Sequence, residues 1–117
     1  MKTHMDLDVW KKSMDFVEKI YKISSQFPKE EMYGLTSQIR RAAVSVPSNI
    51  AEGASRQGSK EFIQFLYISL GSLSEVETQT MLAKRLDFVH NIELILNEIT
   101  TIKKMLNGLI THMKSRI

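Results

Sequence analysis

The sequence predicts an all-α protein, an up-and-down antiparallel four-helix bundle that forms one domain over residues 1–117. Apolar residues recur at steps of three and four along most of the chain, which is the period of amphipathic helices. Only two prolines and five glycines interrupt the 117 residues, and no alternating pattern typical of strands competes. Four long helices joined by short connections pack as such a bundle, and the longer ones would span about 40 Å at 1.5 Å per residue.

The first helix is predicted over about residues 8–26. One row of its apolar residues is Trp10, Met14, Val17 and Tyr21, and a neighbouring row is Val9, Phe16, Ile20, Ile23 and Phe27. Together the rows make a broad apolar face at helical spacing. Asp6 or Asp8 is expected to cap the start, because a carboxylate accepts hydrogen bonds from free N–H groups and suits the helix dipole. Pro28 ends the helix, since the residue before a proline is pushed out of the helical region.

The second helix is predicted over about residues 35–57, with a kink at Pro47. Its apolar face is Leu35, Ile39, Ala42, Val46, Ile50 and Gly53. Pro47 has no N–H to donate to the Ala43 carbonyl, and its ring crowds that carbonyl, so the helix is expected to bend. A complete break is the alternative, in which Asn49 caps a new helix. Gly58 suits a left-handed position after the last turn.

The third helix is predicted over about residues 59–85, with Ser59 as its cap. Its buried row is Phe62, Leu66, Ser69, Leu73, Val76 and Thr80, at heptad spacing. Further apolar residues surround the first half: Ile63, Phe65, Tyr67, Ile68 and Leu70. A helix that is apolar nearly all round needs cover on several sides, which predicts an interface in a homo-oligomer. Gly71 costs about 1 kcal/mol against alanine inside a helix, and we expect another backbone to pass close to it.

The fourth helix is predicted over about residues 90–114, beginning at His90 or Asn91. Its apolar residues keep a three-four repeat over three heptads: Ile92, Ile95, Ile99, Ile102, Leu106, Leu109 and Met113. Gly108 does not interrupt this repeat. The pattern is therefore the strongest indication of helix in the chain.

A polar row follows the other side of the second helix, again at steps of three and four, and ends at Arg56. If it faces another helix, it can form a hydrogen-bonded network that fixes register or an interface between copies. The predicted members of this network are Gln38, Arg41, Ser45, Asn49 and Glu52, with Glu75 from the third helix. The alternatives are a site for a small ligand or phosphate, and acid–base catalysis, which the absence of an accompanying nucleophile disfavours.

The net charge is +3 and the isoelectric point about 9.2. Cations concentrate around the second helix and in the C-terminal region, where acids are scarce. The candidates for contact with nucleic acid are Arg40, Arg41, Arg56, Lys60, Lys103, Lys104, Lys114 and Arg116. Phosphate contacts with RNA or DNA need only such side chains, although no recognition-helix, RRM or KH signature accompanies them. A solvated charged surface is the plain alternative.

Several classes of site find no support. The chain has no cysteine, which excludes disulfides and thiolate metal sites. His4, His90 and His112 are not at metal-binding spacing, and neither a nucleophile elbow nor a phosphate loop occurs. We therefore expect no catalytic residues, no metal and no cofactor. No signal peptide is visible and no apolar run reaches the roughly 18 residues of a membrane span, so a cytoplasmic protein without a membrane partner is expected.

The sequence resembles a known bacterial family across about residues 7–114. The most specific match is Gly34-Leu35, Gln38-Ile39-Arg40-Arg41-Ala42 and Pro47-Ser48-Asn49-Ile50-Ala51-Glu52-Gly53, with Phe62, Leu66, Gly71-Ser72 and Glu75 in support. This is similar to the four-helix bundle family named after the 23S rRNA intervening-sequence proteins. The resemblance implies a four-helix bundle that forms ring-like homopentamers. The accessory proteins of diversity-generating retroelements are similar in fold, and those basic pentamers associate with a reverse transcriptase and nucleic acid.

Two hypotheses of function follow. The first is a non-enzymatic oligomeric helical bundle, with a pentamer implied by the resemblance, that binds RNA or DNA through a basic surface. The second is a scaffold whose partner is another polypeptide. An enzyme would need a pocket with converging polar groups, and the sequence does not indicate one.

Overall fold

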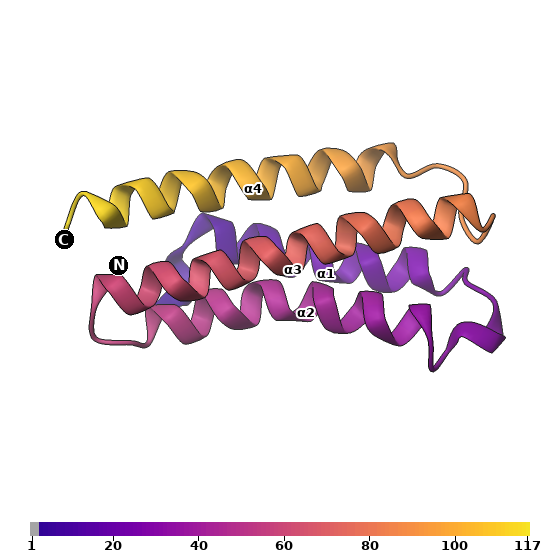
Figure 1. Cartoon of the computed structure of the whole chain (residues 1–117), viewed down its shortest axis with the longest axis horizontal. Helices are drawn as coiled ribbons and strands as arrows, with labels where there is room; N and C mark the ends of the chain where they lie inside the picture. Colours follow the sequence, from indigo (N-terminus) through magenta and orange to yellow (C-terminus); the bar gives the residue numbers. More distant parts are fainter. Residues whose placement is uncertain (1–2) are drawn as a thin grey trace.

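The computed structural model describes residues 3–117, and it confirms the all-α class. Within these residues the chain forms four α-helices and no strand. The helices are α1 (Asp8–Ser24), α2 (Leu35–Ala54), α3 (Ser59–Arg85) and α4 (Glu93–Lys114). A short 3₁₀ turn, η1 (His4–Asp6), precedes α1, and a second, η2 (Lys29–Glu31), joins α1 to α2. The helices run up and down in an elongated bundle that measures 46 × 23 × 19 Å (Figure 1).

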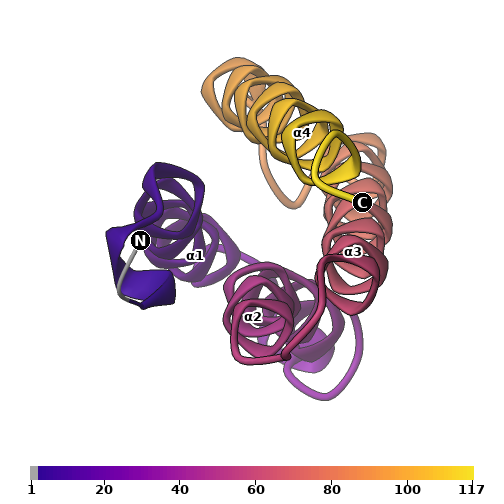
Figure 2. The ribbon, with the colours of Figure 1, turned by 90° about the vertical axis from the view of Figure 1, so that its left-hand side faces the viewer.

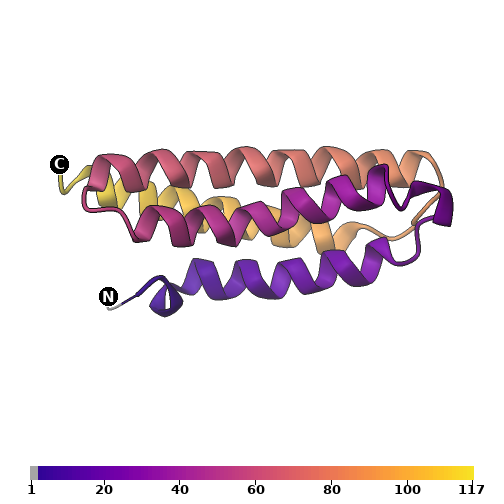
Figure 3. The same ribbon diagram turned by 90° about the horizontal axis from the view of Figure 1, so that it is seen from below.

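The helices follow one another around the bundle in chain order (Figure 2). The view from below shows α2 lying between α1 and α3 (Figure 3). The α2–α3 turn lies at the same end as the start of η1 and the end of α4, while the α1–α2 and α3–α4 connections lie at the other end. Among neighbours, α2 and α3 pack most closely and α1 and α4 least closely. The bundle therefore has one tight seam and one loose seam.

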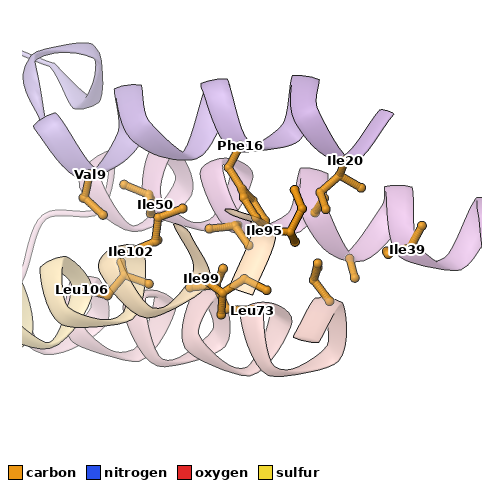
Figure 4. Packing of buried hydrophobic residues seen from close by; sticks show 14 of the residues in the cluster. Val9, Phe16, Ile20, Ile39, Ile50, Leu73, Ile95, Ile99, Ile102 and Leu106 are labelled. Carbon is orange, nitrogen blue, oxygen red and sulfur yellow. The ribbon is translucent and has the colours of Figure 1, made fainter. Parts of the chain in front are cut away.

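The core is built from the apolar rows that the spacing predicts, with exceptions on α1 and at the end of α4, where Leu109 and Met113 are only partly buried. Side chains from all four helices meet in the centre (Figure 4). Fully buried members include Phe16, Ile20, Ile39, Ile50, Leu66, Leu73, Ile99, Ile102 and Leu106. On α1 the row with Val9, Phe16 and Ile20 is buried, whereas Met14 and Tyr21 of the other row are exposed. The face of α1 that reaches the core is thus narrower than predicted.

Two predicted caps are wrong. Asp8 is the first residue of α1 instead of its cap, and Leu7, at the cap position, makes no side-chain bond. Asp6 belongs to η1, where its carboxylate accepts a hydrogen bond from the Thr3 N–H at 3.1 Å. At α3 the cap position is held by Gly58, whose φ of −121° is extended and not left-handed as predicted, and Ser59 is already helical. The extended backbone at Gly58 reflects its place at the start of α3, four residues beyond the end of α2.

The helix boundaries also differ at three ends. The first helix stops at Ser24, the second at Ala54, and the fourth begins at Glu93. Before α4, the Asn91 side chain accepts a hydrogen bond from the Glu93 N–H at 3.2 Å, so Asn91 shapes the turn without starting the helix. At each of these three ends, the outer residues of the predicted helix lie in a short turn instead.

Pro47 does not break α2, which is α-helical from Leu35 to Ala54. The alternative of a new helix capped by Asn49 is therefore wrong. Asn49 lies inside the helix, and its side-chain amide donates to the Ser45 carbonyl at 2.8 Å. Pro47 is itself buried. The kink that a mid-helix proline favours stays a prediction.

The end of α3 is closed by a Schellman motif. The Phe88 N–H donates to the Ala83 carbonyl at 2.9 Å and the Asp87 N–H to the Lys84 carbonyl at 3.0 Å. Asp87 has a φ of 62°, the left-handed conformation that this motif requires. Phe88 then folds back beside Phe27, with ring centroids 5.8 Å apart. These bonds turn the chain sharply toward α4.

Candidate nucleic-acid interface

The eight predicted cations do not form one surface. Four of them gather at the end of the bundle where the α2–α3 turn meets the C-terminal end of α4, the end that faces the viewer in Figure 2. We call these residues the basic end: Arg56, Lys60, Lys114 and Arg116. Arg40 and Arg41 lie early on α2, toward the opposite end, and Lys103 and Lys104 lie midway along α4. The four-residue cluster is therefore a product of the fold.

The basic end borders a groove of about 420 Å³. Arg56, Ser59 and Arg116 line it together with His112, and Phe62 is among its apolar lining. The groove lies beside the first turn of α3, whose N-terminal N–H groups carry partial positive charge. Side-chain cations and a helix N-terminus thus act on the same space, which suits a negatively charged ligand.

The cations of the basic end differ in how they are paired. Arg56 lies 3.4 Å from Glu52 and 3.9 Å from Glu61, and its guanidinium covers the Phe65 ring at 5.0 Å. Within residues 3–117, Lys60, Lys114 and Arg116 make no ion pair, and all are exposed. These three side chains are consequently available for phosphates, while Arg56 is partly neutralised.

The Arg40 side chain is hydrogen-bonded to the C-terminal end of α1. Its Nε donates to Ser24 Oγ at 2.8 Å, and a terminal nitrogen donates to the Tyr21 carbonyl at 3.3 Å. The guanidinium also lies over the Tyr21 ring at 4.6 Å. A cation at this place satisfies the last carbonyls of α1 and complements its dipole. This capping role was missed, because sequence spacing does not reveal which helix end lies beside Arg40.

The two lysines on α4 divide in the same way. Lys103 Nζ lies 3.0 Å from Glu77 Oε1 and ties α4 to α3. Lys104 is exposed, and among the described residues it has no ion-pair partner. Neither residue belongs to the basic end.

The predicted polar network forms only in part. Ser45 and Ser72 share a hydrogen bond of 2.8 Å between α2 and α3, and Asn49 donates to Ser45 Oγ at 2.8 Å. Ser72 was not among the predicted members. Glu52 pairs instead with Arg56. A network of short hydroxyl and amide side chains therefore joins the two helices near their middle.

The remaining predicted members line a shallow groove of about 390 Å³ between α2 and α3. Gln38, Arg41 and Glu75 lie along it with Gln79, whose side-chain oxygen is buried and has no hydrogen-bond partner among residues 3–117. Arg41 and Glu75 are exposed and, within the described part of the chain, form no ion pair. Close by, Ser69 Oγ donates to the buried Val46 carbonyl at 2.9 Å.

Residues 3–117 contain no group of three histidine, cysteine, aspartate or glutamate residues that could hold a metal ion. In the same range, no helix is both long enough and apolar enough to cross a membrane.

The fold and this surface define a class, the small antiparallel four-helix bundles with an exposed cationic end. The family model of the 23S rRNA-intervening sequence proteins matches residues 5–108, and the chain belongs to this family. The match points to no enzymatic class. No curated protein matches the chain.

Proposed function

We propose that this protein is a non-enzymatic homo-oligomeric bundle that binds RNA or DNA through its basic end. The observation that carries the proposal is the gathering of Lys60, Lys114 and Arg116 at one end of the bundle, where they are exposed and without ion-pair partners in the described chain. Arg116 also lines the groove at this end. Contacts between lysine or arginine and phosphates supply most of the affinity of sequence-independent binding. Binding of this kind needs exposed cations and no catalytic group, metal or cofactor.

The opposite end of the bundle offers an internal contrast. Its cations Lys29, Lys84 and Arg85 share that end with carboxylates from the two connections and the start of α4. These carboxylates are Glu30, Glu31, Asp87 and Glu93. At the basic end, Glu52 and Glu61 both flank Arg56, and Asp6 and Asp8 lie on the α1 side. The side formed by α3 and α4 therefore keeps a net positive charge.

Self-association would strengthen such a surface. Exposed apolar side chains occur on α3 at Ile68 and Leu82, and at Leu86, the residue that follows the helix. A separate groove of about 330 Å³ lies between α1 and α2. Its lining is mainly apolar and includes Trp10, Met14, Val17, Val44 and Pro47. Two different patches that meet between copies give a head-to-tail contact, and such contacts close into rings when the rotation permits.

An oligomer also multiplies the charge. Three available cations per chain bind phosphate weakly, but several basic ends in one assembly engage the same strand at high effective concentration. A pentamer, as the family resemblance implies, would present 15 such cations, since three come from each of five chains. Light scattering on the purified protein measures the mass of the assembly and therefore the number of chains in it.

Binding is tested with a fluorescein-labelled RNA and a DNA of the same mixed sequence, followed by fluorescence anisotropy from about 50 to 200 mM salt. The affinity should fall steeply with salt. Replacing Lys60, Lys114 and Arg116 by alanine removes three phosphate contacts and should flatten the log–log slope by about 2 on a single strand. The matched control replaces Lys29, Lys84 and Arg85 at the opposite end and should leave the slope unchanged. Absence of binding at low salt, or an equal loss in both triple variants, would falsify the proposal.

A protein-interaction scaffold is the second candidate, and one observation favours it. A groove of about 490 Å³ runs between α1 and α4. Leu94, which is 75% exposed, lies in it with Ile23 and Ile95, and Lys12 and Lys22 flank them. Apolar anchors with a charged rim are typical of protein interfaces. Pull-down from the host with and without nuclease separates the candidates, because a polypeptide partner that survives nuclease supports the scaffold.

A further inference from the structure

We infer that Tyr67, beside the basic end, is a stacking platform that makes the surface selective for single-stranded nucleic acid. This inference rests on the proposed function and names its substrate class. Tyr67 lies on α3, and the residue is 48% exposed. Lys114 Nζ lies 5.6 Å from the ring centroid. An exposed aromatic ring beside a cation is the pairing that proteins use to hold unpaired bases and their phosphates.

Lys60 extends this arrangement along α3. It precedes Tyr67 by seven residues, which is two helical turns, so both side chains lie on the same side of the helix about 10 Å apart along its axis. Lys114 comes from the neighbouring helix α4. The ring therefore lies between a cation toward the end of the bundle and a cation toward α4, and a strand that crosses it has positive charge on two sides.

Gly71 leaves the helix surface next to Tyr67 open. In a helix a side chain lies over the turn that precedes its own Cα, so a side chain at position 71 would lie over the turn of Tyr67. Gly71 has none, and a Cβ built there meets no atom within 4 Å. Within residues 3–117, the close backbone expected at Gly71 is therefore not found. A glycine weakens a helix, and here that cost leaves the helix surface beside Tyr67 open.

The geometry favours unpaired bases over a duplex. Tyr67 stands on the outer surface of a long regular helix, and it reaches a base only if that base is free of its own stack. Bases inside a duplex are stacked and paired, so a duplex can use only the cations. Stacking on a tyrosine is also tolerant of sequence, because every base has a π face. We therefore expect little preference among single-stranded sequences.

The test uses the full-length protein and two fluorescein-labelled probes of about 20 nucleotides, oligo-dT and a hairpin duplex of equal length, at low salt. Tyr67→Leu keeps apolar bulk but removes the π face, and it should weaken oligo-dT binding about tenfold while duplex binding changes less than twofold. Tyr67→Phe retains the ring and should restore most of the affinity. Unchanged binding of oligo-dT by Tyr67→Leu, or an equal loss on both probes, overturns the inference.

A second variant separates binding from folding. Gly71→Leu replaces a helix-weakening residue and should raise the melting temperature, yet it should weaken oligo-dT binding by covering Tyr67. Gly108→Leu is the matched control, since Gly108 is also exposed, helical and open, but lies on α4. It should leave oligo-dT binding unchanged. If Gly71→Leu binds as well as the wild type, the uncovered ring plays no part in binding.

Light scattering accompanies each variant. A loss of oligo-dT binding together with a changed oligomer mass would mean that Tyr67 and Gly71 lie between copies, and that result overturns the inference. Failure of the proposed function looks different, because the triple-cation variant would then match the wild type on both probes. If the triple-cation variant loses binding but Tyr67→Leu does not, the basic end binds nucleic acid through charge alone and the stacking inference is wrong.

Discussion

The α2–α3 seam and the α1–α4 seam hold the same bundle together by opposite means. Between α2 and α3 the backbones come so close that a Cβ on Gly53 would lie 2.7 Å from Phe65 Cβ and 2.9 Å from Phe62 Cδ1. Between α1 and α4 two lysines reach across to one carboxylate, with Lys12 and Lys19 at 3.4 and 2.7 Å from Glu98. Short residues allow direct contact at the first seam, and long charged side chains span the second.

The difference has an energetic meaning. The tight α2–α3 seam relies on the close fit of its side chains and on buried hydrogen bonds, which salt does not screen appreciably. The loose α1–α4 seam adds ion pairs between partly exposed lysines and Glu98 to its share of the apolar core, and such ion pairs contribute little and weaken with salt. Substitutions at the tight seam should therefore lower the free energy of unfolding more than substitutions at the loose seam do. Their effect should also be the same at low and high ionic strength.

Gly53→Ala should give the largest effect. Alanine normally stabilises a helix by about 1 kcal/mol over glycine, but here its Cβ meets Phe65 near the backbone and cannot be accommodated without moving α3. Overpacking of this kind costs about 1–3 kcal/mol, and after the helix gain is subtracted we expect a net loss of up to about 2 kcal/mol in the free energy of unfolding. Urea denaturation measures it. Gly108→Ala, in open space, is the control and should gain stability; a stabilised Gly53→Ala would show that the seam is not tight.

Ser69→Ala should come next, with a loss of about 1 kcal/mol. The serine hydroxyl is fully buried and donates to the Val46 carbonyl across the seam. Removing it leaves that carbonyl with one bond fewer in a place that water does not reach. Thr78→Ala provides the comparison, because the Thr78 hydroxyl is exposed and bonds only within its own helix, to the Ser74 carbonyl. Equal losses in the two variants would argue against a special role for the bond between helices.

Glu98→Gln probes the loose seam and should lower the free energy of unfolding by less than about 1 kcal/mol. Glutamine keeps the shape of Glu98 but leaves Lys12 and Lys19 without their counter-charge. The difference from the wild type should shrink between about 0.05 and 1 M NaCl, as screening removes what the ion pairs contribute. Thermal melts at both salt concentrations measure it. A difference that persists at high salt would show that packing, and not charge, joins these helices.

The smallest effect should be a dependence on alkaline pH. The hydrogen bond to Glu98 raises the pKa of the Lys19 ammonium above its ordinary value. A raised folded-state pKa gives stability that is fully present below the unfolded pKa of about 10.4 and is lost as pH rises through the folded pKa. The wild type should therefore lose slightly more stability above pH 10 than Glu98→Gln does. Parallel pH profiles for the two proteins would contradict this assignment.

The helices were predictable because burial depends on period, and the period is written in the sequence. All four were placed within a few residues, and the apolar row of α4 was correct from Ile92 to Leu106. In the last turns of α4, Ile110 is buried, whereas Leu109 and Met113 of the predicted row are only partly buried. The caps at Asp8 and Ser59 were not, because a cap depends on the angle at which the chain reaches the helix. That angle is fixed by what the turn packs against, which local sequence does not determine.

The candidate site was predictable in composition but not in arrangement. The eight cations could be named, yet only the topology brings Lys60 of α3 and Lys114 of α4 to the same end of the bundle and turns Arg40 toward the end of α1. The same holds for Ser69, which belongs to the predicted buried row. Its acceptor, the Val46 carbonyl, lies on another helix, so spacing along α3 could not reveal the bond.

Trp10 gives α1 its own fluorescent reporter. It is the sole tryptophan of the chain, it lies on α1 in the groove against α2, and its ring meets His4 edge-on at 5.1 Å. Its fluorescence therefore reports the detachment of α1, while circular dichroism in the far ultraviolet averages over all helices. Transitions that coincide indicate one cooperative unit. A fluorescence change at lower denaturant concentration would mean that α1 leaves first and that α2, α3 and α4 persist as a partly folded intermediate.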